Sequence, residues 1–109
     1  MLLELHPDAK LDVLEAADWY DARAPGLGDD LVAEFEGTLS TILEAPRTWM
    51  AWPGAPVLDP PIRRVLLWRF SSYAVAFRVL PDRVFVLALV HSSREPFYWA
   101  HRTGPAQTK

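Results

Sequence analysis

Several residues that can bind anions lie in the apolar C-terminal part of the sequence, at positions that can share one face of a β-sheet: Arg63, Arg69, Arg78, Arg83 and His91. A guanidinium group donates paired hydrogen bonds to a carboxylate or a phosphate, and an imidazole can exchange a proton near neutral pH. Apolar residues alternate with them on the same predicted face, including Leu67, Phe85 and Leu87. This pattern predicts a surface that binds an anionic or amphipathic partner.

Three strands are expected to carry these residues, at 62–70, 73–80 and 83–91, because each segment is rich in β-branched and aromatic residues. Ser71-Ser72 and Pro81-Asp82 separate them as turns. The shortest hairpins predict an antiparallel meander whose second face is wholly apolar near its centre and is expected to be covered by helices: Leu66, Trp68, Val75, Phe77, Val86 and Ala88. A slip of one residue would exchange the two faces.

The first half of the sequence predicts two helices. Apolar residues recur at helical spacing after Pro7, and again from Leu31 to Leu43. Ala24-Pro25-Gly26-Leu27-Gly28 makes a tight turn between them, so the helices form an antiparallel hairpin. Trp19 falls on the polar face of the first helix, where a ring of its size indicates a contact surface. Residues 2–5 are expected to add a short strand, giving an α+β fold of order β-α-α-β-β-β.

Length and composition predict a single domain over residues 1–102, with a disordered tail at 103–109. The sequence has no cysteine and its longest purely apolar run is short, so a soluble protein of the cytoplasm without membrane contact is expected. Charge is segregated: residues 1–45 hold 11 acids and 2 bases, and residues 46–109 hold 3 acids and 9 bases. The three histidines show no spacing typical of a metal site, and no cofactor is expected.

The ordered set of motifs resembles the RelE/ParE superfamily, the toxins of type II toxin–antitoxin (plasmid-stabilisation) systems. The motifs are Pro25-Gly26-Leu27-Gly28, the stop at Pro46, Ile62-Arg63-Arg64, Trp68-Arg69-Phe70 and the ending from Leu89 to Arg102. The resemblance covers about residues 2–102. It implies a helical hairpin packed on a twisted antiparallel sheet, and a cognate antitoxin that forms a hetero-oligomer with the chain.

The resemblance implies one of two mechanisms. RelE-like members cut mRNA on the ribosome without a metal, which requires a base for the 2′-hydroxyl, cations for the phosphate and an acid for the leaving oxygen. In that case Arg69 and Arg78 would hold the phosphate, His91 would be the base, and Arg94 or Tyr98 would lie at the leaving group. Such members carry lysines on this sheet, whereas Lys10 and Lys109 lie outside it.

ParE-like members instead bind and inhibit DNA gyrase as protein ligands, and the sequence favours this alternative. Arginines among apolar and aromatic residues are typical of protein interfaces. The residues expected to contact the target or the antitoxin are Trp19, Arg63, Leu67, Arg69, Arg78, Arg83, Phe85 and Leu87.

Overall fold

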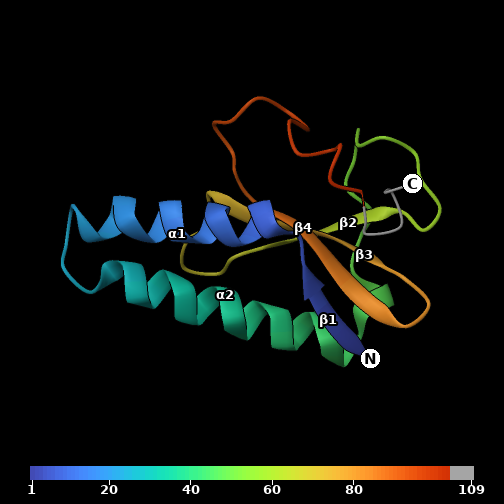
Figure 1. Ribbon diagram of the computed structural model, residues 1–109, viewed down its shortest axis with the longest axis horizontal. Helices are drawn as coiled ribbons and strands as arrows, with labels where there is room; N and C mark the ends of the chain where they lie inside the picture. Colours follow the sequence, from blue (N-terminus) through green and yellow to red (C-terminus); the bar gives the residue numbers. More distant parts are fainter. Residues whose placement is uncertain (104–109) are drawn as a thin grey trace.

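The computed structural model describes residues 1–103, and of the predicted tail only Thr103 falls within this range. The elements along the chain are β1 (Leu2–Leu5), α1 (Pro7–Asp21), α2 (Leu27–Glu44), a short 3-10 helix η1 (Pro46–Thr48), β2 (Ile62–Leu66), β3 (Tyr73–Val79) and β4 (Arg83–His91). The predicted α+β class and element order are confirmed. Figure 1 shows α1 and α2 side by side against the sheet.

Local chemistry explains where the helices begin and end. Pro7 occupies the first turn of α1, and the Nδ1 atom of His6 accepts a hydrogen bond from the Asp8 backbone N–H at 3.0 Å. Gly26 has φ 90°, a left-handed conformation that favours glycine, and it reverses the chain into α2. The Gly28 N–H then donates to the Asp21 carboxylate at 2.7 Å, which ties the start of α2 to the end of α1.

The four strands form one sheet in the order β1-β4-β3-β2. β2, β3 and β4 are antiparallel as predicted, but β1 lies parallel to β4, so the sheet is mixed rather than purely antiparallel. Residues at both ends of the chain therefore meet within the sheet: Leu2 pairs with Arg83, and Leu5 pairs with Val86. β2 and β1 form the two edges.

The register of the meander differs from the prediction in two places. β2 ends at Leu66, which pairs with Ala74 and not with Phe77, because Leu67–Phe70 form part of a longer connection to β3. Leu67 consequently packs in the core against the helices, whereas Leu66 and Trp68, expected on the covered face, are 57% and 92% exposed. Between β3 and β4 a bulge follows the Ala76–Ala88 pair, since the next pair is Phe77 with Val86. The bulge leaves Leu87 without a partner in β3.

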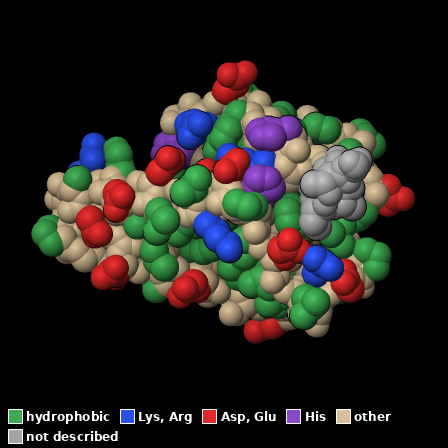
Figure 2. Space-filling view, in the orientation of Figure 1, with side chains coloured by type: hydrophobic (Ala, Val, Ile, Leu, Met, Phe, Trp, Pro, Cys, Tyr) green, Lys and Arg blue, Asp and Glu red, His purple; other side chains and the backbone are tan. Residues whose placement is uncertain are grey.

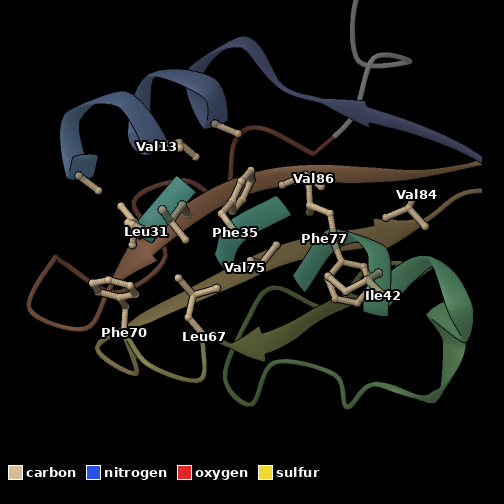
Figure 3. Packing of buried hydrophobic residues seen from close by; sticks show 14 of the residues in the cluster. Val13, Leu31, Phe35, Ile42, Leu67, Phe70, Val75, Phe77, Val84 and Val86 are labelled. Carbon is tan, nitrogen blue, oxygen red and sulfur yellow. The ribbon is translucent and has the colours of Figure 1, made fainter. Parts of the chain in front are cut away.

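The core between the helices and the sheet contains the predicted stripes of both helices. Phe77 is fully buried at its centre, together with Val75 and Val86. Because of the bulge, Leu89 takes the place predicted for Ala88, which lies on the opposite face of the sheet. Figure 3 shows Phe35 and Leu31 of α2 facing these strands. This part of the predicted packing, with Phe77 against the helices, is confirmed.

The opposite face of the sheet was expected to be open for a partner, and this expectation is wrong. The loop before β2 and the C-terminal segment cover it with Trp52, Leu58, Phe97 and the fully buried Trp99. Beneath them lie Phe85 (2% exposed) and Leu87 (0% exposed). Half the residues are apolar in this chain, and both faces of the sheet bury them.

Candidate functional site

A groove of about 320 Å³ lies between α1 and the segment that follows β4. Four groups of residues line it: Asp12, Glu15, Ala16 and Trp19 from α1, Tyr73 from the start of β3, Leu89 and His91 from β4, and Ser93, Arg94 and Tyr98 from the C-terminal segment. Of the residues predicted to act in catalysis, it brings together His91, Arg94 and Tyr98. It also includes Trp19, which is 49% exposed as its unusual position predicted.

The other two residues expected at a catalytic site lie elsewhere. Arg69 is exposed and forms an ion pair with Asp30 of α2 at 3.1 Å, while its backbone N–H donates to Glu34 at 2.7 Å. Arg78 is 8% exposed, and its guanidinium donates to the carbonyls of Pro60 at 3.0 Å and Thr103 at 2.6 Å. Burial lowers the pKa of Arg78. Both arginines hold the fold together, and neither lines the groove.

The remaining predicted contact residues also have structural partners. Arg63 donates to the carbonyl of Trp49 at 2.6 Å, and Arg83 forms ion pairs with Asp82 and Glu4. Leu67, Phe85 and Leu87 are buried, so a partner that approaches this surface does not reach them. The prediction that this face of the sheet is an exposed binding surface bearing arginines is therefore wrong.

The imidazole of His91 is held in one orientation. Its Nδ1 atom accepts a hydrogen bond from the Ser93 backbone N–H at 3.0 Å and lies 2.8 Å from the Ser93 hydroxyl. The ring also meets Tyr73 edge to face, with 4.8 Å between centroids. A backbone N–H is always the donor, so the neutral ring carries its own proton on Nε2. The lone pair that a general base needs is thus already engaged.

Aromatic rings with arginines over them form the exposed rim of the groove. The guanidinium of Arg23 lies 3.3 Å from the centre of the Trp19 ring, and that of Arg94 lies 4.2 Å from the centre of the Tyr98 ring. Burial raises the pKa of Tyr98, so its phenol stays protonated at neutral pH. Rings of this kind supply large contact areas, and guanidiniums add directional hydrogen bonds, which suits recognition of a protein surface.

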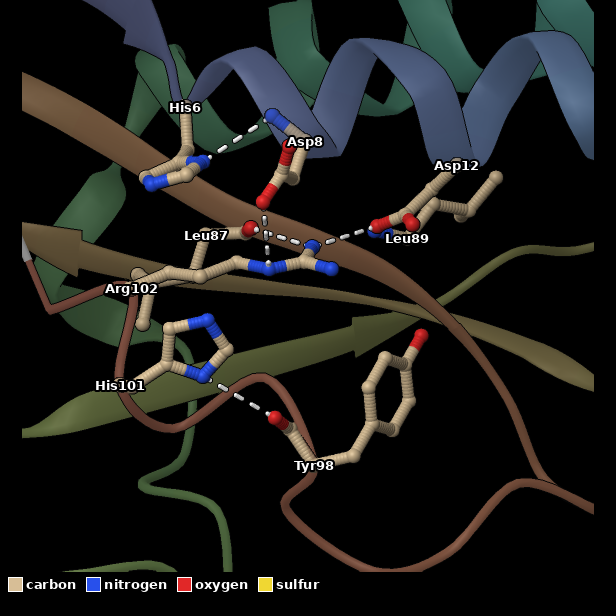
Figure 4. Close-up of polar contacts among 8 residues, drawn as sticks. All are labelled: His6, Asp8, Asp12, Leu87, Leu89, Tyr98, His101 and Arg102. Carbon is tan, nitrogen blue, oxygen red and sulfur yellow. Dashed lines mark hydrogen bonds and ion pairs between the residues drawn. The ribbon is translucent and has the colours of Figure 1, made fainter.

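A buried ion pair at the inner end of the groove was not predicted. The guanidinium of Arg102, 8% exposed, donates to the Asp12 carboxylate at 2.8 Å and to the Leu87 carbonyl at 3.2 Å, and the Tyr98 ring lies beside it (Figure 4). The same carboxylate accepts the Leu89 N–H at 3.1 Å. β1 ends opposite Val86, so these two side chains bond backbone groups of β4 beyond the end of β1.

Part of this cluster has a signal in the sequence. Asp8, Asp12, Glu15 and Trp19 follow one another at spacings of four, three and four residues, which places them on one stripe of α1. Nothing near Arg102 in the sequence identifies Asp12, 90 residues away, as its partner. Figure 2 shows further acidic side chains spread over the helical half of the molecule, in keeping with the predicted charge segregation.

No helix within residues 1–103 has the length and apolar content that crossing a membrane requires. In the same part of the chain, no three histidine, aspartate or glutamate side chains are grouped as ligands for a metal ion.

No protein-family model and no curated protein matches the sequence. Among solved structures, the chain resembles one described as a chromosomal ParDE TA system from P. aeruginosa, with a TM-score of 0.68. The two chains share one fold. They are 21% identical, and the match covers 84% of this chain and 95% of the other. At this identity the likeness establishes the fold, and the function has to be argued from the site.

Proposed function

We propose that this chain is the toxin of a type II toxin–antitoxin module, that it inhibits DNA gyrase by binding to it, and that a cognate antitoxin neutralises it. Two findings support the general class: the motifs of the RelE/ParE superfamily, and the fold shared with a chain of a ParDE TA system. The residues that line the groove support inhibition by binding.

The hydrogen bond that His91 Nδ1 accepts is the observation that favours binding over catalysis. Metal-independent RNA cleavage needs a base with a free lone pair and cations around the phosphate. The Nδ1 lone pair of His91 is taken by the Ser93 N–H, and neither Arg69 nor Arg78, the two arginines predicted to hold the phosphate, lines the groove. Glu15 lines it as well, and its carboxylate repels a phosphate. Exposed aromatic rings and Arg94 remain as anchors for a protein target.

A second groove, of about 460 Å³, supports the assignment of an antitoxin. It lies between β1 and the two helices, and it is mostly apolar: Leu3, Leu5, Val13, Leu14, Val32, Phe35, Leu39 and Leu43 line it with Lys10, Glu36 and Ser40. Leu3 is 38% exposed and Leu14 is 58% exposed. In Figure 2 hydrophobic side chains reach the surface over the helical hairpin. An amphipathic antitoxin helix would cover this surface with its apolar face.

The test of mechanism is induced expression without the antitoxin, with plasmid supercoiling and mRNA cleavage as the two readouts. We expect growth arrest with altered supercoiling and intact mRNA. His91→Ala should preserve the arrest, and Arg94→Ala should weaken it, because an interface anchor contributes about 1–3 kcal/mol. Arg47→Ala, which removes an exposed arginine outside the groove, is the matched control. Cleaved mRNA that is lost in a folded His91→Ala variant would establish the ribosome-dependent nuclease instead.

The test of the antitoxin uses the product of the reading frame next to this gene. Co-expression should restore growth, and the two proteins should copurify. Leu14→Glu places a charge in the apolar groove and should abolish copurification, whereas Leu11→Glu, on the same helix but outside the groove, should not. Equal copurification of both variants would refute this placement of the antitoxin.

A further inference from the structure

The outer edge of β2 is free along half of its length. In an antiparallel pair, alternate residues direct their backbone groups to the partner strand and away from it. The Leu67 N–H donates to the Tyr73 carbonyl of β3 at 3.0 Å. The backbone groups of Leu67 therefore point toward β3, and those of Leu66 point away from it. By the same alternation, Arg64 and Ile62 also direct their N–H and C=O groups away from β3.

The chain covers the first half of this edge itself. The Trp52 N–H donates to the Ile62 carbonyl at 2.8 Å, and the Arg64 N–H donates to the Met50 carbonyl at 3.1 Å, so residues 50–52 lie there as a short added strand. Beyond this point, no group in residues 1–103 bonds to the Arg64 carbonyl or to the backbone of Leu66. The edge therefore accepts strand addition, and half of it is vacant.

Exposed apolar side chains stand beside this vacant half. Leu66 is 57% exposed, Trp68 is 92% exposed and Met50 is 56% exposed. Arg64 and Leu66 are two residues apart in β2, so their side chains lie on one face of the strand, and Trp68 follows two residues after the strand ends. Free edges are usually protected by charge or by short length, and a tryptophan at this position instead indicates a contact.

Charge decides between the possible occupants of the edge. Residues 60–81 contain four arginines and no acid. The guanidinium of Arg64 lies 5.4 Å from the centre of the Trp52 ring and has no carboxylate partner within the described chain. A second copy of this chain, paired edge to edge, would bring like charges together, which disfavours pairing. An acidic strand would complement them.

We propose that the vacant edge of β2 binds an extended segment of a partner protein as an added strand, with acidic residues near Arg64 and apolar residues against Leu66 and Trp68. The surface lies on the strand at the far end of the sheet from β1, so it is distinct from the apolar groove on the helical hairpin. The inference does not depend on the proposed function, because it rests on the edge and its side chains alone.

The test uses two synthetic peptides that differ only in charge. The first is Thr-Glu-Thr-Leu-Thr-Val-Thr-Glu-Thr, which places acids and apolar residues on one face, and the second has lysine in place of glutamate. Binding is measured by isothermal titration, and hydrogen exchange of the Leu66 amide is measured by NMR. The acidic peptide should bind about tenfold more tightly, more weakly as salt is added, and should protect the Leu66 amide. Equal binding of both peptides, or an unprotected Leu66 amide, would overturn the proposal.

Variants of the edge separate its backbone from its side chains. Leu66→Pro removes the outward N–H together with the leucine side chain and should abolish binding. Leu66→Ala keeps the N–H, and it should weaken binding only about tenfold, as should Trp68→Ala. Arg64→Glu should reverse the preference to the lysine peptide, which keeps the test decisive even where Leu66→Pro does not fold. Leu11→Ala removes an equally exposed leucine from α1 and should change nothing. Self-association of the unbound protein that Trp68→Ala abolishes would assign the edge to a second copy and refute the proposal.

Discussion

Arg102→Met should destabilise the protein by breaking the one buried ion pair that joins the C-terminal segment to α1 in the described structure. Methionine keeps most of the side-chain length but removes every donor. The Asp12 carboxylate would then lie in a largely buried place without its cation, and the Leu87 carbonyl would lose its hydrogen bond. The variant therefore exposes how much the pair contributes.

The structure sets the expected magnitude. Removing one partner of a buried pair costs about 3–5 kcal/mol. The Nε atom of Arg102 has no hydrogen-bond partner and lies 4.0 Å from the Asp8 carboxylate, so the pair is incompletely satisfied and we expect about 3 kcal/mol. Adding Asp12→Asn removes the stranded charge and keeps an acceptor for the Leu89 N–H. The double variant should therefore recover about 1–2 kcal/mol of the loss.

The destabilisation caused by Arg102→Met should depend on pH. Burial raises the pKa of Asp12, and Arg102 partly opposes that shift. In Arg102→Met the folded-state pKa rises further, so the folded protein binds more protons than the unfolded chain between that pKa and the ordinary value of 3.8. The free-energy difference between wild type and variant should thus shrink as the pH falls toward 3.8.

Urea unfolding followed by circular dichroism, at pH 7 and at a mildly acidic pH, measures both effects. If Arg102→Met lowers the free energy of unfolding by less than about 1 kcal/mol at pH 7, the pair contributes no more than a solvent-exposed ion pair, and the reasoning is refuted. A difference that does not change with pH would show that Asp12 does not gain a proton when Arg102 is absent.

Other substitutions test the register, the helical hairpin and the groove. Phe77→Ala should cost about 3–5 kcal/mol in urea unfolding, whereas Leu66→Ala should stay within about 0.5 kcal/mol, because only Phe77 is in the core. Gly28→Ala should destabilise, since an added Cβ would collide with the backbone carbonyl oxygen of Ala17 in the facing helix, whereas Gly37→Ala meets no atom within 4 Å and should stabilise by up to about 1 kcal/mol. Tyr98→Phe keeps the ring beneath the neighbouring guanidinium and should leave growth arrest unchanged, which a colony count on inducing medium would show.

The helices and the core were predictable because each depends on local periodicity. The stripe that contains Val13 and Phe35 follows from 3.6-residue spacing, and the turn at Gly26 follows from its composition. The strand register was only partly predictable. Pairing counted from the β3–β4 turn holds as far as Phe77 with Val86, and fails beyond, because a bulge leaves no mark in an apolar run such as residues 84–90.

The site was less predictable than the fold, because the role of an arginine depends on its distant partners. Arg69 and Arg78 were expected to bind a ligand, and both instead bond to other parts of the chain. Trp19 and Arg94, by contrast, do line the groove. The distinction arises from long-range contacts of α1, α2 and the C-terminal segment, which no spacing along the sequence encodes.

The parallel pairing of β1 with β4 has a consequence for how the chain folds during its synthesis. Leu2 pairs with Arg83, and Asp12 bonds Arg102 across 90 residues. β1 therefore cannot pair with the sheet until β4 has been synthesised. Closing such a long loop must precede the contacts that reward it, which slows folding compared with helical pairs formed locally. The sheet and the groove are therefore completed only when the residues up to Arg102 have left the ribosome. For the function proposed above, a nascent chain would remain inactive until Arg102 has left the ribosome, which gives an antitoxin time to meet the toxin as it folds.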